Sequence, residues 1–316
     1  MALGLGLHSW AGIGEESTYG TLVARTKFLE IVSENIKVES PRTPRDTLTG
    51  ASRKYYRPGK IAVAGDIVHE LGYEGAELLF KHLFGSVASV QQAATAAYKH
   101  SFTLADAPPV GLSVEINKGD VSGFFYEGCH IGELKLAQAV DEPLQAAWSI
   151  IGQAETRGAK STPTFPTDRP ADWDDVITAT IGGVTIGLKS MELTFNNALA
   201  DDRYILGSRD RKGIGRGAAR AVSGSLVAEF ETLTEYEYFT DEDEKVLIFT
   251  WRGALIASTF YHQIDLTLNR AIFVGETPEV GGEGPMEVTL NFEAFYDVAG
   301  AKDEIAVDIT NTLTSV

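Results

Sequence analysis

Histidine, cysteine and the acidic residues are the side chains best suited to catalysis or metal binding, and their spacing in this 316-residue chain favours neither. The single cysteine, Cys129, excludes an intramolecular disulfide and a zinc site made of cysteines. The six histidines are scattered without the paired spacing of zinc ligands. They are His8, His69, His82, His100, His130 and His262. We therefore expect these side chains to pack structurally, with no bound metal ion.

Three short stretches resemble ligand-binding loops only superficially. Residues 213–217 (GIGRG) have the wrong spacing for a dinucleotide loop, and residues 59–60 (GK) lack the remaining residues of a phosphate loop. The acidic turn 241–244 lacks the central glycine and terminal glutamate of a calcium loop. We expect no cofactor and no enzymatic activity. Spacing in sequence does not reveal carboxylate pairs that hydrolyse glycosides, so a β-sandwich glycosidase or a carbohydrate-binding β module stays open as an alternative.

Charge is distributed unevenly along the chain. The 27 basic against 44 acidic residues give a net charge of −17, which disfavours binding to nucleic acid through its phosphates. Two segments run against this trend: residues 40–60, here called the first arm, and residues 209–220, here called the second arm. Their basic residues are Arg42, Arg45, Arg53, Lys54, Arg57 and Lys60 in the first arm, and Arg209, Arg211, Lys212, Arg216 and Arg220 in the second.

Both arms fall between predicted strands, in connections that contain glycine, so we expect them to project from a sheet. One interpretation is that each arm docks on an acidic patch of a neighbouring copy, where opposite potentials set the register and speed the encounter. The other interpretation is that both are ordinary solvated loops.

The elements that would position these segments are mostly strands. Apolar and polar residues alternate with a period of two in residues 288–296, 264–268, 191–195, 110–116 and 146–150, which is typical of strands with one buried face. About a dozen such segments are separated by Gly, Pro, Asn and Asp. The pattern predicts a mainly β protein.

Two segments have helical spacing. Residues 74–84 carry an apolar stripe and are followed by Gly85, a common C-terminal cap. Residues 86–98 are rich in alanine and predict a second, weaker helix. Residues 156–171 contain three prolines among polar residues, so we expect a linker or long loop there.

Blocks on the two sides of this linker resemble each other. Residues 57–71 match residues 216–230 without a gap, residues 129–136 match 261–268, and residues 143–150 match 285–292. Three matched blocks in the same order indicate a tandem duplication of one β domain. We predict an N-terminal arm at 1–20, a first β domain at 21–155, the linker at 156–171 and a second β domain at 172–316. The match also places His130 and His262 at corresponding positions.

The first eight residues lack the basic and apolar regions of a signal peptide, and no run approaches about 18 apolar residues. We expect a soluble protein without an export signal or a membrane partner.

Several short motifs resemble those of the tail tube proteins of long-tailed bacteriophages. They are residues 14–21 (GEESTYGT), 63–66 (VAGD), 128–136 (GCHIGELKL), 285–297 (PMEVTLNFEAFYD) and 305–311 (IAVDITN). The resemblance implies a β-sandwich with a flanking helix and a place in the virion tail after assembly in the host cytoplasm. It implies copies of the chain and other tail proteins as partners, joined in rings that stack into a conduit for the genome. It brings no catalytic residues.

Carrying the domain twice predicts three chains in a pseudo-six-fold ring, with a six-chain ring as the alternative. Another ring component of the phage, such as a tail terminator or a decoration protein, is the alternative function. In a tube, the arms would dock between rings, and DNA would pass through the lumen without specific binding.

Two sets of acidic residues fit this interpretation. A strand predicted over residues 226–239 would carry acids on one face, and these face either the lumen or the outer solvent. They are Glu229, Glu231, Glu235 and Glu237. The candidate receiver for the arms of another ring consists of Asp172, Asp174, Asp175, Asp241, Glu242, Asp243 and Glu244.

Overall fold

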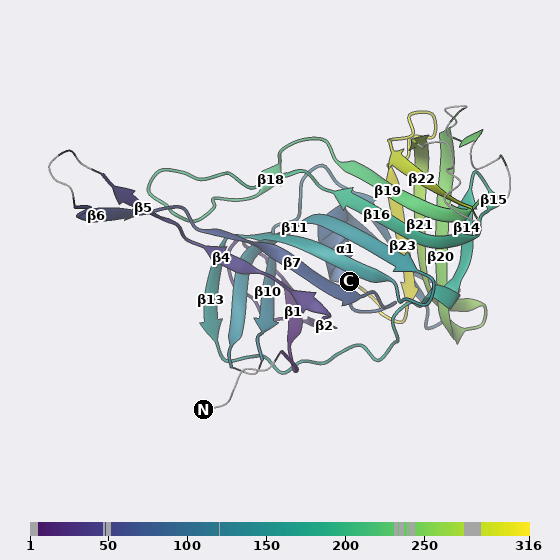
Figure 1. Ribbon diagram of the computed structural model, residues 1–316. Helices are drawn as coiled ribbons and strands as arrows, with labels where there is room; N and C mark the ends of the chain where they lie inside the picture. Colours follow the sequence, from purple (N-terminus) through teal and green to yellow (C-terminus); the bar gives the residue numbers. More distant parts are fainter. Residues whose placement is uncertain are drawn as a thin grey trace.

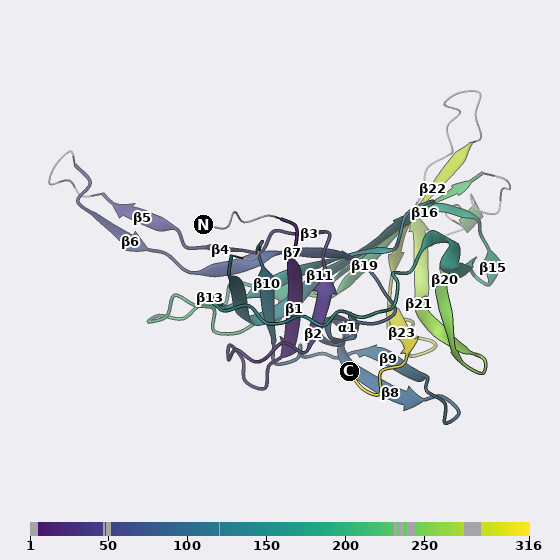
Figure 2. The same ribbon diagram turned by 90° about the horizontal axis from the view of Figure 1, so that it is seen from below.

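Antiparallel strands make up most of the computed structural model of this chain (Figures 1 and 2). The structure describes residues 6–46, 48, 52–119, 121–230, 233, 237, 238, 240, 244–274 and 286–316. The sequence alternation explains the strands: in β22 (Glu287–Ala294) every second side chain is buried, starting at Val288. Nineteen strands form one hydrogen-bonded network. The expectation of a mainly β fold is confirmed.

The first half of the chain runs from β1 to β13. Its elements are β1 (Trp10–Glu15), β2 (Lys27–Glu30), β3 (Ser33–Glu34), β4 (Lys37–Glu39), β5 (Arg42–Arg45), β6 (Tyr55–Pro58), β7 (Ala62–Glu70), α1 (Glu77–Phe84), β8 (Gly85–Gln91), β9 (Tyr98–Leu104), β10 (Leu112–Asn117), β11 (Gly123–Ala139), β12 (Gln145–Gly152) and β13 (Ala154–Gly158).

The second half runs from β14 to β23, after the short 3-10 helix Trp173–Asp175. Its strands are β14 (Val176–Ile181), β15 (Val184–Thr185), β16 (Leu188–Asn196), β17 (Leu199–Ala200), β18 (Gly215–Arg216), β19 (Ala221–Glu229), β20 (Glu244–Ala257), β21 (Phe260–Val274), β22 and β23 (Ile305–Asn311).

The first half is a β-sandwich. One layer has the order β2-β1-β10-β11-β13. The long strand β11 then continues into the other layer, where β12 and β7 follow it and β3 and β4 form the edge. Because β1 lies inside the first layer and is buried along nearly its whole length, this half begins at or before Trp10 rather than at residue 21.

Helix α1 flanks the sandwich and closes its core. The Phe80 ring lies edge-on to Trp148 of β12 at 5.0 Å, and the Phe84 ring contacts Phe195 of the second half at 5.5 Å. The helix ends as expected at Gly85, which adopts φ 105° and donates its backbone N–H to the carbonyl of Lys81. It begins at Glu77, three residues later than the apolar stripe suggests.

The second expected helix, residues 86–98, is wrong. Residues 85–91 form β8, which pairs with β9, and β9 pairs in turn with β23 near the C-terminus. The hydrogen bonds of the sheet outweigh the helix propensity of the alanines, which is a weak preference for each residue.

The linker is more ordered than its prolines suggest. Its first residues, 156–158, belong to β13 and pair with β11. Farther on, the backbone N–H and the hydroxyl of Ser161 both donate to the buried Glu115 carboxylate, at 2.7 and 2.6 Å. The segment is therefore a strand followed by a loop that packs on the first half.

The two halves share one continuous sheet. Strand β16 of the second half pairs with β11 of the first over seven residue pairs, from Glu133↔Asn196 to Ala139↔Ser190. The order in this sheet is β7-β12-β11-β16-β19-β22-β21, and Figure 1 shows these strands running side by side across the molecule. Among the described residues, no helix is long and apolar enough to span a membrane.

Candidate assembly interface

The central strand pairs of the two halves have the same register. In β7–β12, Gly65 lies opposite Ile150, and in β19–β22, Gly224 lies opposite Phe292. All eight residue pairs of the two ladders keep this correspondence, 159 positions apart on the first strand and 142 on the second. Because a register fixes which side chains face the core, the two ladders bury equivalent positions.

The correspondence extends to the strands on either side. The pair Val38↔Val63 of β4–β7 has its counterpart in Phe195↔Val222 of β16–β19. Within the arms, Arg42↔Pro58 of β5–β6 has its counterpart in Leu199↔Arg216 of β17–β18. The outer pairings β1–β10, β10–β11 and β11–β13 likewise recur as β14–β20, β20–β21 and β21–β23.

A glycine at the same place in each half has the same physical cause. A Cβ on Gly65 would lie 2.5 Å from the Cα of Ile36 in the neighbouring chain segment. A Cβ on Gly224 would overlap the carbonyl oxygen of Glu192 in β16 and lie 2.5 Å from the Phe292 ring. Close approach of the adjacent backbone therefore excludes a side chain at both positions.

One of the three matched blocks is aligned wrongly by sequence. His130 of β11 pairs with Ile151 of β12, and the equivalent pair in the second half is Ile272↔Glu293. His130 therefore corresponds to Ile272 and not to His262. The true displacement is 142 residues, ten more than the sequence match of 129–136 with 261–268. A shift by an even number leaves the same residues on the same face of a strand, so alternation alone does not distinguish the two alignments.

One edge of the shared sheet is open. Strand β16 pairs with β19 on one side and with β11 on the other. Its counterparts in the first half, β3 and β4, pair within the described residues with β7 alone. An exposed row of backbone donors and acceptors is a template for another strand.

The second arm lies on the first half of its own chain. Arg211 is 2% exposed, and its guanidinium donates to the carbonyls of Gly152, at the end of β12, and of Asp201. The side chain of Gln153 in turn donates to the Arg211 carbonyl at 2.9 Å. Sequence reasoning missed Gly152 and Gln153, because backbone carbonyl acceptors carry no signal in residue type.

Its other arginines also bind within the chain. Arg209 donates to Gly59 and Ser40 at the root of the first arm, at 2.8 and 2.6 Å. Arg216 and Arg220 both donate to the Ala105 carbonyl after β9 and to the side chain of Asn197. The expectation that these arginines reach a neighbouring copy therefore conflicts with four sets of contacts inside one chain, while Lys212 is exposed.

The first arm behaves differently. Its strands β5 and β6 form a hairpin that projects away from both halves, at the left of Figures 1 and 2. All eight residues of these strands are exposed, and so are Arg53, Lys54 and Lys60. Local contacts are an Arg53–Asp46 ion pair at 2.8 Å and the Arg42 guanidinium over the Tyr56 ring. The predicted projection from the sheet is seen in this arm.

The strand predicted over residues 226–239 is wrong in its second part. Strand β19 ends at Glu229, and the backbone N–H of Glu237 donates to the Leu233 carbonyl in a helical geometry. Glu231 and Glu235 lie outside the described residues. Glu229 stands opposite Glu287 of β22, and Lys189 bridges both carboxylates at 3.0 and 2.7 Å. The four acids therefore do not share one strand face.

The proposed acidic receiver is divided in the same way. Asp175 is buried and accepts hydrogen bonds from Tyr73 at 2.9 Å and from Arg169 at 2.6 Å. Asp172 caps the 3-10 helix, Asp174 is exposed, and Glu244 pairs with Arg270. Asp241, Glu242 and Asp243 lie outside the described residues.

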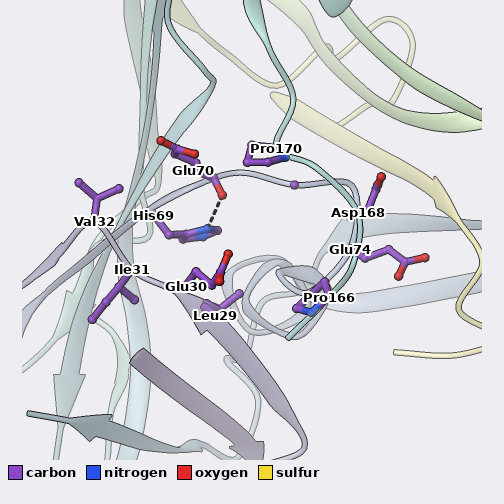
Figure 3. A pocket seen from close by; sticks show the side chains of 11 residues that line it. Leu29, Glu30, Ile31, Val32, His69, Glu70, Glu74, Pro166, Asp168 and Pro170 are labelled. Atoms are coloured by element: carbon purple, nitrogen blue, oxygen red, sulfur yellow. Dashed lines mark hydrogen bonds between the residues drawn. The ribbon is translucent and has the colours of Figure 1, made fainter. Parts of the chain in front are cut away.

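A small pocket of about 270 Å³ collects several titratable groups and was examined for chemistry (Figure 3). The indole N–H of Trp148 donates to His69 Nε2, and His69 Nδ1–H donates to the Glu70 carbonyl, both at 2.9 Å. This pattern fixes the neutral ring, and burial lowers the pKa of His69 to about 4. Both nitrogens are occupied by structural partners, so His69 is not a general base.

Buried histidines elsewhere also have structural partners. His130 Nε2 lies 2.9 Å from the Pro109 carbonyl, and burial lowers its pKa to about 4. His100 lies between Ser89 and Asn311, and His262 lies 3.3 Å from Asp168. Cys129 is fully buried, and burial raises the pKa of its thiol. Within the described part of the chain, no cluster of His, Cys, Asp and Glu could hold a metal ion.

A comparison with protein families agrees with this architecture. A family model described as phage tail tube protein matches residues 10–294. No curated protein matches the chain. The match covers both sandwiches, from β1 to the end of β22. The chain therefore belongs to the phage tail tube protein family and is a structural protein of the bacteriophage virion.

Proposed function

We propose that this chain assembles with copies of itself into rings, and that the rings stack into a tube through which the genome passes. The observation that carries the proposal is the open edge of β3 and β4 at one end of a sheet whose internal junction, β11–β16, joins two equivalent ladders. A second copy would continue the sheet, and closing the ring would remove the edge.

The repeated pairing pattern supports a tandem duplication in which each half is one tube unit. The units would run from β1 to β13 and from β14 to β23, with the loop of residues 159–171 between them. Three chains would then supply six units to a pseudo-six-fold ring, and a ring of six chains would supply twelve.

The charge of the chain suits a conduit for DNA. A net charge of −17 avoids the many phosphate contacts that, multiplied along a tube, would hold the duplex. The two arms concentrate positive charge in two segments, of which the first is exposed.

Negative-stain electron microscopy of the purified chain at high concentration tests the proposal. We expect filaments with a central channel, and a class average viewed down the axis with six similar units from three chains. A chain that stays monomeric at every concentration would contradict the assembly, and twelve units per ring would contradict the trimer.

Neutralising the first arm tests its part in assembly. The combined Arg42→Gln, Arg45→Gln, Arg53→Gln and Arg57→Gln variant should keep its fold, because all four side chains are exposed, yet give few or no filaments. Circular dichroism checks the fold and microscopy the filament yield. The matched control neutralises four exposed basic residues elsewhere, Lys135, Arg157, Arg252 and Lys302. Equal filament yields from the two variants would remove the arm from the assembly.

A further inference from the structure

We propose that the first arm of one copy docks on the second half of the copy beside it, at the end of β22, as the second arm docks on the end of β12 within one chain. The inference rests on the proposed function and makes one part of it specific. It assigns the arm to a neighbour in the same sheet, where the sequence alone suggested docking between rings.

The contact inside the chain is the template. The second arm belongs to the connection between β16 and β19, and it reaches across the β11–β16 junction to the first half. There the buried Arg211 guanidinium donates to the Gly152 carbonyl, and Gln153 donates back to the Arg211 carbonyl. The arm thus fastens together two units whose strands already pair.

Each participant has a counterpart across the repeat. The ladder register places Ala294 and Phe295 where the first half has Gly152 and Gln153. Arg211 precedes the strand pair at Arg216 by five residues, and Arg53 precedes its counterpart Pro58 by five. Arg53 of one copy and the end of β22 in another are therefore the equivalents of the partners seen within one chain.

The first arm has no second half beside it in a single chain, because β3 and β4 stand at the open edge of the sheet. Its hairpin extends beyond that edge (Figure 2). Two strands without a core are marginally stable alone, and this hairpin exposes Tyr55 by 67% and Tyr56 by 63%. Docking would cover both rings.

The proposed receiving surface has the matching chemistry. Just after β22, the large apolar side chains Phe295, Tyr296 and Val298 are exposed by 41, 47 and 77%. Glu293 and Asp297 lie in and beside this segment, where they can meet the basic residues of the arm. Aromatic rings next to opposite charges are typical of protein interfaces.

Cross-linking between two single-cysteine variants tests the contact. Arg53→Cys and Phe295→Cys are prepared separately, mixed, assembled and treated with a bismaleimide of about 10 Å. The native Cys129 is fully buried, so the unmodified chain serves as the unreactive control. We expect a covalent dimer in the mixture that is at least tenfold more abundant than with either variant alone.

A matched control replaces Phe295→Cys by Val90→Cys, which lies on β8 and is 59% exposed, and should give no more dimer than a single variant. Tyr296→Cys is the second receiving variant, should Phe295→Cys assemble poorly. Filaments without the dimer from either receiving variant would overturn this inference and leave the tube intact. Absence of any filament from the unmodified chain would overturn the tube and this inference together, whereas the dimer without filaments would support the contact alone.

Discussion

At the scale of single residues, the two arms differ in what surrounds an arginine. Arg211 is buried among backbone carbonyls that far-off segments supply, while Arg53 is 69% exposed in its side chain and pairs with Asp46 of its own hairpin. A buried guanidinium is tolerated only when its donors find acceptors, so the second arm is a fixed part of the fold.

Arg211→Ala should therefore lower the free energy of unfolding by about 2 kcal/mol, because it leaves the carbonyls of Gly152 and Asp201 without their donor. Arg53→Ala is the matched control and should change it by less than about 0.5 kcal/mol. Urea unfolding of both variants measures the difference. Equal midpoints would contradict the role given to Arg211.

His69 should make stability depend on pH. Burial lowers its pKa in the folded state to about 4, below the usual 6.5, so the unfolded chain takes up the proton first as the pH falls. The stabilisation is complete above pH 6.5 and is lost between pH 6.5 and 4. By pH 5, about 2 kcal/mol should be gone.

The His69→Gln variant keeps an acceptor for Trp148 but does not titrate. Between pH 7 and 5, urea unfolding should show a smaller loss for this variant than for the unmodified chain. His8→Gln, which replaces an exposed ring, controls for the removal of a histidine. Parallel losses in the His69 variant and the unmodified chain would contradict the prediction.

At the scale of elements, strand register organises the molecule. The β7–β12 and β19–β22 ladders share their pairing, and each needs a glycine where the neighbouring backbone comes close. Local propensity is secondary: the alanine-rich segment after α1 forms strands because β9 and β23 offer it a ladder.

Gly224→Ala should destabilise the fold by about 2 kcal/mol, because the added methyl group meets the backbone of β16 and the Phe292 ring. Gly187→Ala is the control, since a Cβ there has no atom within 4 Å. Thermal unfolding of the two variants measures the difference. A Gly224→Ala variant as stable as the control would mean that the strands separate without cost.

At the scale of the whole molecule, charge segregation should govern the rate of assembly. The exposed first arm is basic in a chain of net charge −17, so its docking gains from long-range attraction. In 1 M NaCl the screening length falls to about 3 Å, and polymerisation should slow by at least tenfold relative to 0.1 M. Light scattering records the rate. A rate independent of salt would assign docking to the apolar contacts of Tyr55 and Tyr56.

The sequence by itself determined the class of the fold, the helix that ends at Gly85, the basic arms and the presence of a repeat. These features follow from residue type and short-range periodicity, which act locally and can be seen along the chain. The alternation of β22 is an example, since its buried side chains are those that the pattern predicts.

Only the tertiary structure decided the alignment of β11 with β21, the burial of Arg211 and the difference between the two arms. The alternation of a strand is unchanged by an even shift, so only the hydrogen-bonded partners fix the register. The partners of Arg211 are backbone carbonyls of Gly152 and Asp201, and every residue type carries such a group. Contacts made by the backbone of distant segments leave no mark on the sequence.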